Sequence, residues 1–427
     1  MEATLAYSLI LAFFCIGYLA IIFEFFVKLN KTAVALFTGV ICWTIYFLGN
    51  LEPLSVDITD LSERLSDTSE ILFFLLGAMT LVELIDSHKG FQTVMRFIHT
   101  HSKRQLLWTV SFFAFFLSAV LDNLTTTILM ISILKKLVPN RKTRLTFSCM
   151  VIIAANAGGA WTPIGDVTTT MLWIQGQITT LKVMNEVFFP SLICMLVPLM
   201  IYTYSMRKGT TTKEPPQIEE KEPGAKLVFC MGIASLLLVP IFHWLTGVPP
   251  YMAILIALAI LWFVTDILHY KYEHRQHLRV PHILTKVDVS NILFFLGILL
   301  TIDSLDSIGF LEGVATWLQV HIGSLPAIAT LIGIFSAIID NVPLVAATMG
   351  MYSIEQFPQD SNLWMMIAYA AGTGGSILLI GSSSGVAMMG MEKINFFSIY
   401  EKSEPSSISR IFSRYGSLSR FSCLRRY

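Results

Sequence analysis

The residues with the clearest chemical potential are two Asp-Asn pairs that interrupt long apolar runs. Asp122 and Asn123 stand in SAVLDNLTTT, and Asp340 and Asn341 stand in SAIIDNVPLV, 218 positions later. A carboxylate at bilayer depth costs on the order of 3 kcal/mol or more, so such a residue is usually functional. Helix capping would explain one pair, but two pairs at matched positions favour a binding site.

Two further apolar regions are interrupted by Gly, Pro, Ser and Thr. NAGGAWTPIGD (156–166) ends in Asp166, and GTGGSILLIGSSSG (372–385) ends in a serine run. Irregular backbone at membrane depth survives only where protein or a water-filled cavity satisfies its polar groups. Hydroxyl groups here could instead bond within their own helix, an alternative of equal weight for the Thr168–Thr170 run. The candidate hydroxyl and amide ligands are Asn123, Thr125, Thr126, Asn156, Thr162, Thr168, Thr169, Asn341, Thr373 and Ser376.

The charges of these regions indicate a cation as the ligand. Asp122, Asp166 and Asp340 lie at the interruptions, and the apolar stretches around them contain no Lys or Arg. An anion would favour neutral helix N-termini, whereas small hard cations prefer carboxylate, carbonyl and hydroxyl oxygens. Protons and a metal cation would compete for the same carboxylates, so alternating access to the site would exchange one for the other.

These residues need a membrane scaffold to position them. Of the 427 residues, 54% are hydrophobic and 14% charged, whereas soluble domains carry about 25% charged residues. The sequence predicts an all-α polytopic membrane protein, with about ten spanning segments if broken helices are included. The first apolar run lacks a basic leader and a cleavage site, so we expect it to be retained. Uninterrupted spans are predicted at about 4–27, 32–50, 70–87, 186–206, 227–245, 251–270 and 289–305.

Other classes of protein receive little support from the sequence. The formal net charge is zero, which gives no indication of a nucleic-acid partner. HExxH and phosphate-binding motifs are absent from the sequence, so we do not expect an enzyme. No cofactor is expected.

The chain contains an internal repeat. SEILFFLLGAMTLVELIDS resembles SNILFFLGILLTIDSLDS, the Asp-Asn segments match, and AANAGGAWTPIGD resembles AAGTGGSILLIGS. Three blocks in the same order predict two copies of one unit, at about 1–206 and 227–400, joined by the linker 207–226. Each copy is predicted to contain a hairpin, at about 106–134 and 325–350, and a broken helix, at about 145–176 and 363–391.

The distribution of Lys and Arg predicts the orientation, because short cytoplasmic loops collect them. Loops 88–105 and 135–144 are both basic, yet a single apolar segment separates them. That segment should be a re-entrant hairpin with the first Asp-Asn pair near its tip. From Val287 to Glu392 there is no Lys or Arg, so the second hairpin should enter from outside, where we also expect the acidic loop 52–70. Two hairpins of opposite orientation predict an inverted-repeat transporter with a site near the midplane.

Histidines form a separate titratable set. His243, His269 and the loop histidines at 88, 99 and 101 lie beside predicted spans. Imidazole titrates near neutral pH, so pH sensing is one interpretation and ordinary surface placement is the commoner one.

The motifs together resemble the NhaD-type sodium/proton antiporters of the ion transporter superfamily. The resemblance rests on SAVLDNLTTTILM, ANAGGAWTPIGDVTTTMLW, FSAIIDNVPL and GTGGSILLIGSSSGVAMMG, and extends from residue 5 to residue 400. It implies Na+ or Li+ extrusion driven by proton entry across a bacterial inner membrane, on a scaffold-plus-transport-domain fold that is often dimeric. Dicarboxylate and arsenite carriers of the superfamily are the alternative, but the carboxylate carriers use Ser-Asn-Thr tips.

The resemblance also implies particular site residues. The matching positions are Asp122, Asn123, Asn156, Asp166, Thr168, Thr169, Ser336, Asn341 and Ser376. Na+ is expected at Asp122, Asn123, Asn156, Asp166 and Asn341.

The C-terminal stretch departs from the repeat. The first copy ends with the span 186–206, whose counterpart should lie near 402–422. Residues 401–427 are instead polar and rich in Ser and Arg, a composition that cannot cross a bilayer. A truncated or frameshifted end and a native cytoplasmic tail are the two interpretations.

Overall fold

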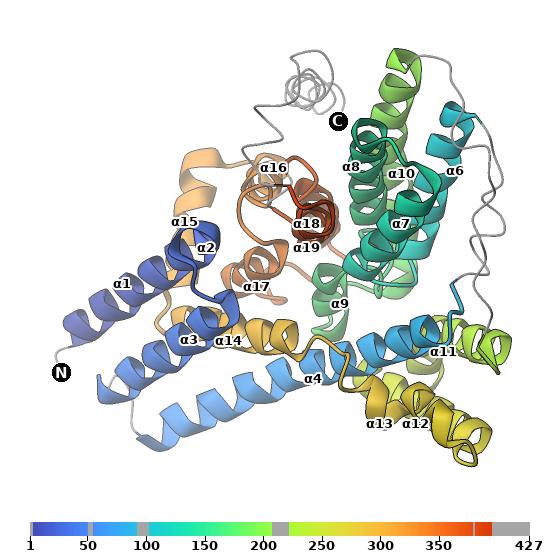
Figure 1. Cartoon of the computed structure of the whole chain (residues 1–427). Helices are drawn as coiled ribbons and strands as arrows, with labels where there is room; N and C mark the ends of the chain where they lie inside the picture. The colour runs from blue at the N-terminus through green and yellow to red at the C-terminus, as the bar shows by residue number, and fades with distance from the viewer. Residues whose placement is uncertain (1–2, 50–53, 92–101, 207–221, 379–380, 395–427) are drawn as a thin grey trace.

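Long apolar helices dominate the computed structural model, which describes residues 3–49, 54–91, 102–206, 222–378 and 381–394. Seven described helices are long and apolar enough to cross a membrane, or up to eight spans if a bent pair counts as one. Each coincides with a predicted uninterrupted span, which confirms the prediction of an all-α multi-pass membrane protein (Figure 1). The seven are α1 (Ala3–Ile22), α3 (Lys31–Leu48), α4 (Leu54–Ser87), α10 (Thr180–Ser205), α11 (Ala225–Thr246), α12 (Pro250–His269) and α14 (Val289–Ser307).

Shorter helices occupy the four interrupted regions, and each predicted interruption is a helix break. In the first copy the breaks separate α6 (Lys103–Ser118) from α7 (Asn123–Leu137), and α8 (Arg141–Gly159) from α9 (Val167–Ile174). In the second copy they separate α16 (Leu325–Phe335) from α17 (Asn341–Met351), and α18 (Asn362–Gly374) from α19 (Ser383–Glu392). The helix after each break begins at a capping side chain that accepts a backbone N–H. The four caps are Asp122, Asp166, Asp340 and Ser382.

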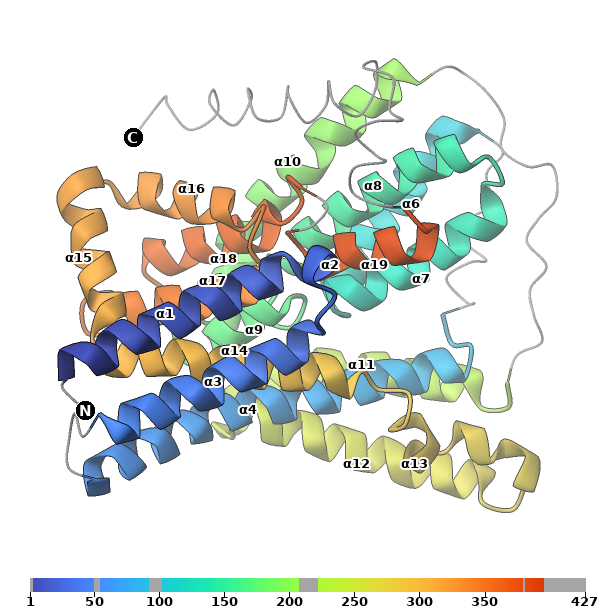
Figure 2. The same ribbon diagram turned by 60° about the vertical axis from the view of Figure 1, so that its left-hand side comes forward.

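The helices pack into several groups, and α9 contacts α4, α17 and α18. Helices α1, α3, α14 and α4 run side by side, and α11 and α12 pack against α4 (Figures 1 and 2). Helices α6, α7, α8 and α10 pack together around Phe115 and Phe147. At the contact between α9 and α4, Trp173 packs edge-on against Phe74, with ring centroids 6.2 Å apart.

The two sequence copies make matching contacts around their breaks. Ser118 donates to the Ala155 carbonyl at 2.6 Å, and Ser336 donates to the Ala371 carbonyl at 2.9 Å. Gly158 lies against the carbonyl of Phe115 as Gly374 lies against that of Gly333, so neither position has room for a Cβ. The sequence repeat is therefore repeated in local packing, while the opposite orientation of the copies stays a prediction.

One segment differs from the prediction. Residues expected in the acidic loop 52–70 are helical from Leu54 onward, because the stretch 54–70 contains no glycine or proline and Arg64 bonds Asp60 one turn earlier at 2.9 Å. The segment after α14 forms α15 (Phe310–Ile322), which bends by 120° into α16. Between α12 and α14 lie the 3-10 helix η1 (Glu273–Leu278) and α13 (Val280–Ile283), while α2 (Glu24–Val27) follows α1.

Several predictions fall outside the described residues. These are the central linker 207–221, the loop histidines 99 and 101, and the polar C-terminal stretch from residue 395.

Candidate cation-binding site

The side chain of Asp122 is fixed where α7 begins. Its Oδ1 accepts the backbone N–H of Thr125 at 2.8 Å, and its Oδ2 accepts the Thr125 hydroxyl at 2.6 Å. The carboxylate thus caps the helix and remains half-buried at the wall of a cavity. A negative charge is well placed at this position, because the first turn of a helix carries partial positive charge.

Asp166 caps α9 and meets the second copy of the repeat. The residue is 2% exposed, and its Oδ1 is 3.4 Å from the backbone nitrogen of Thr168. Its Oδ2 accepts from Nδ2 of Asn341, the first residue of α17, at 3.2 Å. A carboxylate of the first broken helix is therefore held by the amide of the second Asp-Asn pair.

Asn156 is the centre of a second contact between the copies. Its Oδ1 accepts from Asn123 at 3.2 Å, and its Nδ2 lies 3.1 Å from the hydroxyl oxygens of both Ser376 and Ser382. Asn156 is fully buried on α8. These bonds join the first Asp-Asn pair to the break between α18 and α19.

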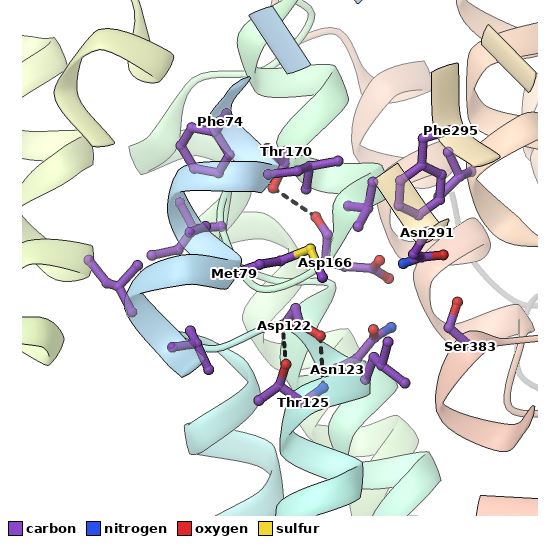
Figure 3. Close-up of a pocket in the computed structure, with 18 of the residues that line it drawn as sticks. Phe74, Met79, Asp122, Asn123, Thr125, Asp166, Thr170, Asn291, Phe295 and Ser383 are labelled. Atoms are coloured by element: carbon purple, nitrogen blue, oxygen red, sulfur yellow. Dashed lines mark hydrogen bonds between the residues drawn. The ribbon is translucent and has the colours of Figure 1, made fainter. Parts of the chain in front are cut away.

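The polar groups converge on a small cavity of about 60 Å³ (Figure 3). Phe74 and Met79 of α4 and Phe295 of α14 form its apolar walls. A cavity needs about 10–15 Å³ for each water, so this one has room for a partly hydrated small cation. Its lining residues include no Lys or Arg, and its oxygen-bearing residues are Asp122, Asn123, Thr125, Asp166, Thr170, Asn291, Asn341 and Ser383.

A larger cavity of about 450 Å³ adjoins the small one. The two share Met79 and Val82 of α4 and Leu124 and Thr125 of α7. Glu83, Asp86, Lys136 and Lys286 add charged groups farther along the larger cavity. The small cavity therefore opens along the seam between α4 and α7.

Several predicted residues lie in the surrounding shell and do not line the small cavity. Their hydroxyl groups bond to backbone carbonyls: Thr169 to Asp166, Ser336 to Ala371, and Thr373 to Tyr369. Asp340 caps α17 through the Val342 nitrogen at 3.3 Å. The hydroxyl of Thr168 is buried and has no hydrogen-bond partner among the described residues.

Within the described chain, no three His, Cys, Asp or Glu residues cluster as a metal site would require.

The cavity also contains residues that the sequence did not single out. Asn291 of α14 lines the wall, at the position that Glu70 occupies in the matching block of the first copy. That alignment was a usable signal, because it places a polar residue before the same apolar run. Phe74 and Phe295 gave no such signal, because apolar residues of a span are equally suited to packing and to lining a site.

Comparisons with known proteins bear on this arrangement. The chain matches the citrate transporter family over residues 18–372. It is 50% identical over 392 residues to sodium/proton antiporter 1 of Arabidopsis thaliana, covering 91% of this chain and 68% of the relative. Sodium/proton antiporter 2 of the same plant is 48% identical, over 91% and 93% of the two chains. The Na+/H+ antiporter NhaD of Vibrio parahaemolyticus is 30% identical, over 77% and 84%.

Proposed function

Because the chain belongs to the citrate transporter family, among its NhaD-type antiporters, we propose that it exchanges Na+ for H+ across a membrane. Relatives named as sodium/proton antiporters over most of this chain support the proposal. The proposal also includes Li+ as a second transported cation. It further includes the homodimer and the inner-membrane location that the NhaD resemblance implies.

One observation carries the proposal: two carboxylates and three amides from both repeat copies line a small cavity without a basic side chain. Asp122 and Asp166 offer oxygens to a small hard cation, and Asn123 and Asn341 offer amide oxygens that can turn towards it. With the cation absent, protons would neutralise the carboxylates. Binding of one species therefore opposes binding of the other, which couples their fluxes.

The construction of the cavity supports a proposal of alternating access. One wall comes from the long helices α4 and α14, and the other comes from the helix breaks. We propose that the broken helices move against α4 and α14, as inverted-repeat transporters do at a midplane site. In this arrangement the larger cavity is the access path from the cytoplasm, the side on which the basic loop before α8 is expected.

Carriage of a carboxylate anion is the second candidate, because the matching family bears the description of a citrate transporter. A tricarboxylate is larger than a partly hydrated Na+ and would bring its negative charges beside Asp122 and Asp166. The cavity of about 60 Å³ offers no Lys or Arg to offset that repulsion. Na+ fits the described site better on both size and charge.

Dissipation of a pH gradient in proteoliposomes tests the proposal. Addition of Na+ or Li+ should release protons through the full chain, and Asp122→Asn should abolish the response. Asn is as good a helix cap as Asp, so this variant removes the charge and retains the Thr125 N–H bond. Asp360→Asn is the matched control, because Asp360 accepts the N–H and the hydroxyl of Thr179, both at 2.7 Å, outside the cavity.

The outcomes separate the candidates. Loss of exchange in Asp122→Asn alone supports a charged cation site, whereas equal exchange in both variants removes Asp122 from the mechanism. Sodium-independent citrate uptake by the parent chain would overturn the proposal in favour of the anion carrier.

A further inference from the structure

Two buried histidines face each other away from the candidate cation site. His88 directly follows α4, and His269 is the last residue of α12. Both are fully buried, and their Nε2 atoms are 3.0 Å apart. They meet where α12 lies beside the end of α4 (Figure 2). Imidazole is the side chain that titrates near neutral pH, so this histidine pair is a candidate proton site.

The neighbours of His88 determine which nitrogen atoms carry hydrogen. Its Nδ1 is 2.8 Å from the Leu84 carbonyl oxygen, which can only accept, so this nitrogen is protonated. The Nε2 of neutral His88 is then an acceptor, and His269 must donate to it from its own Nε2. Neutral His269 therefore keeps a bare Nδ1, which is buried without a hydrogen-bond partner among the described residues.

An added proton has one position that preserves both hydrogen bonds. On Nδ1 of His269, it leaves the Nε2 contact and the bond to Leu84 intact. On Nε2 of His88, it would turn two N–H groups towards each other across 3.0 Å and break the contact. Burial also lowers the pKa of His88 to about 4, which keeps that ring neutral near pH 7. The pair therefore takes up a single proton, at His269.

The surroundings make that proton costly to hold. The charged or titratable groups that act on the two imidazoles are Glu222, Arg275 and His277. Glu222 is the one anionic group among these three, and it is already paired with Lys89 at 3.5 Å. On α12 itself, the carboxylate of Asp266 is bound to Arg279 at 2.8 Å. A protonated His269 would thus be a buried cation near Arg275 without a carboxylate of its own, which destabilises the contact.

We propose that the histidine pair is a proton-binding switch that loosens α12 from α4 when its side of the membrane acidifies. The last turns of α4 direct His88 towards α12 and direct Glu83 and Asp86 towards the larger cavity. Because the end of α4 carries both His88 and these two carboxylates, its release from α12 changes the wall of the access path. This functional consequence rests on the proposed function, whereas the loosening itself does not.

Hydrogen–deuterium exchange of the purified full chain tests the loosening without any transport. After correction for intrinsic rates, amides at the end of α12 and in η1 should exchange severalfold faster at about pH 5.5 than at about pH 8. His269→Gln should remove this pH dependence, because its amide can still donate to His88 but takes up no proton.

His321→Gln is the matched control. The Nδ1 of His321 bonds the carbonyl four residues earlier at 2.9 Å, as that of His88 does, but the ring is exposed. This variant should retain the parent's pH dependence. Equal exchange at both pH values in the parent, or an unchanged dependence in His269→Gln, would overturn the proposal.

The pH profile of exchange in proteoliposomes tests the functional consequence. His269→Gln should keep the parent's maximal rate and shift the acid limb by about half a pH unit or more towards lower pH. Superimposed profiles would refute control of the access path. A parent chain without any Na+ response would instead count against the proposed function, and the amide-exchange result would stand.

Discussion

Replacing Asn156 with Ala should weaken the cation site more than any single hydroxyl deletion around it. The side chain bonds three partners from two repeat copies, at 3.1 to 3.2 Å, and is fully buried. Alanine would leave the amide of Asn123 and the hydroxyls of two serines without this partner. Each unsatisfied buried group costs about 1–3 kcal/mol, partly recovered where a serine finds a backbone acceptor.

The expected loss is therefore about 2 kcal/mol at the site. Since every 1.4 kcal/mol corresponds to about tenfold in affinity, the apparent Na+ affinity should fall about 30-fold. The measurement is the Na+ concentration that gives half-maximal dissipation of a pH gradient in proteoliposomes. Ser376→Ala, which removes one of the three bonds, should cost about fivefold, because a single hydrogen bond contributes about 1 kcal/mol.

An unchanged half-maximal concentration in folded Asn156→Ala would refute this reasoning. It would mean that the bonds between Asn156 and the second copy serve packing alone. Folding is checked by the thermal unfolding midpoint in detergent, and a variant with reduced midpoint but parental Na+ response would lead to the same conclusion.

Further predictions concern Asp340, the packing of buried residues, and the dependence of stability on pH. Asp340→Asn should retain more exchange than Asp122→Asn, because Asp340 caps α17 without lining the cavity; equal loss in vesicles would contradict this. Arg144→Met should destabilise the protein by about 3–5 kcal/mol in an unfolding assay, because it leaves Glu392, whose side chain is 1% exposed, without its ion-pair partner. Glu186→Gln removes one partner of an exposed ion pair and should cost at most about 1 kcal/mol in the same assay. Gly158→Ala should prevent folding because its methyl group would overlap the Phe115 carbonyl, whereas Gly313→Ala has open space and should fold. The depressed pKa of His88 means that the unfolded chain binds its proton first, so stability should be full above pH 6.5 and fall towards pH 4; His88→Gln should flatten that part of the curve of unfolding midpoint against pH.

Local sequence patterns predicted the helices and their breaks well. The lengths of the apolar runs predicted the seven spans, since a membrane-spanning helix requires about 20 apolar residues. Polar residues within apolar runs marked the breaks, because aspartate and serine can cap a new helix there. The prediction of a loop over 52–70 is wrong from Leu54 onward, where α4 begins. A charged segment can also be helical when pairs such as Asp60 and Arg64 lie one turn apart.

The composition of the site could be predicted only in part, because its contacts cross between the copies. Asp166 and Asn341 are separated by 175 positions, and nothing in either segment encodes their 3.2 Å contact. The same holds for Asn156 and Ser382, which meet at 3.1 Å. Sequence reasoning identified polar groups at each break, but not which break faces which.

The contacts between the two repeat copies also explain why both copies are needed. Asp166 begins α9 of the first copy and takes its amide partner from α17 of the second, while Asn156 reaches from α8 to the break before α19. A single copy would leave a buried carboxylate without its amide donor, at a cost of several kcal/mol. The proposed cation site would therefore form only when both sets of broken helices are packed together. A movement that separates them from α4 and α14 can then carry the site as one body, which is what exchange between two faces of a membrane requires.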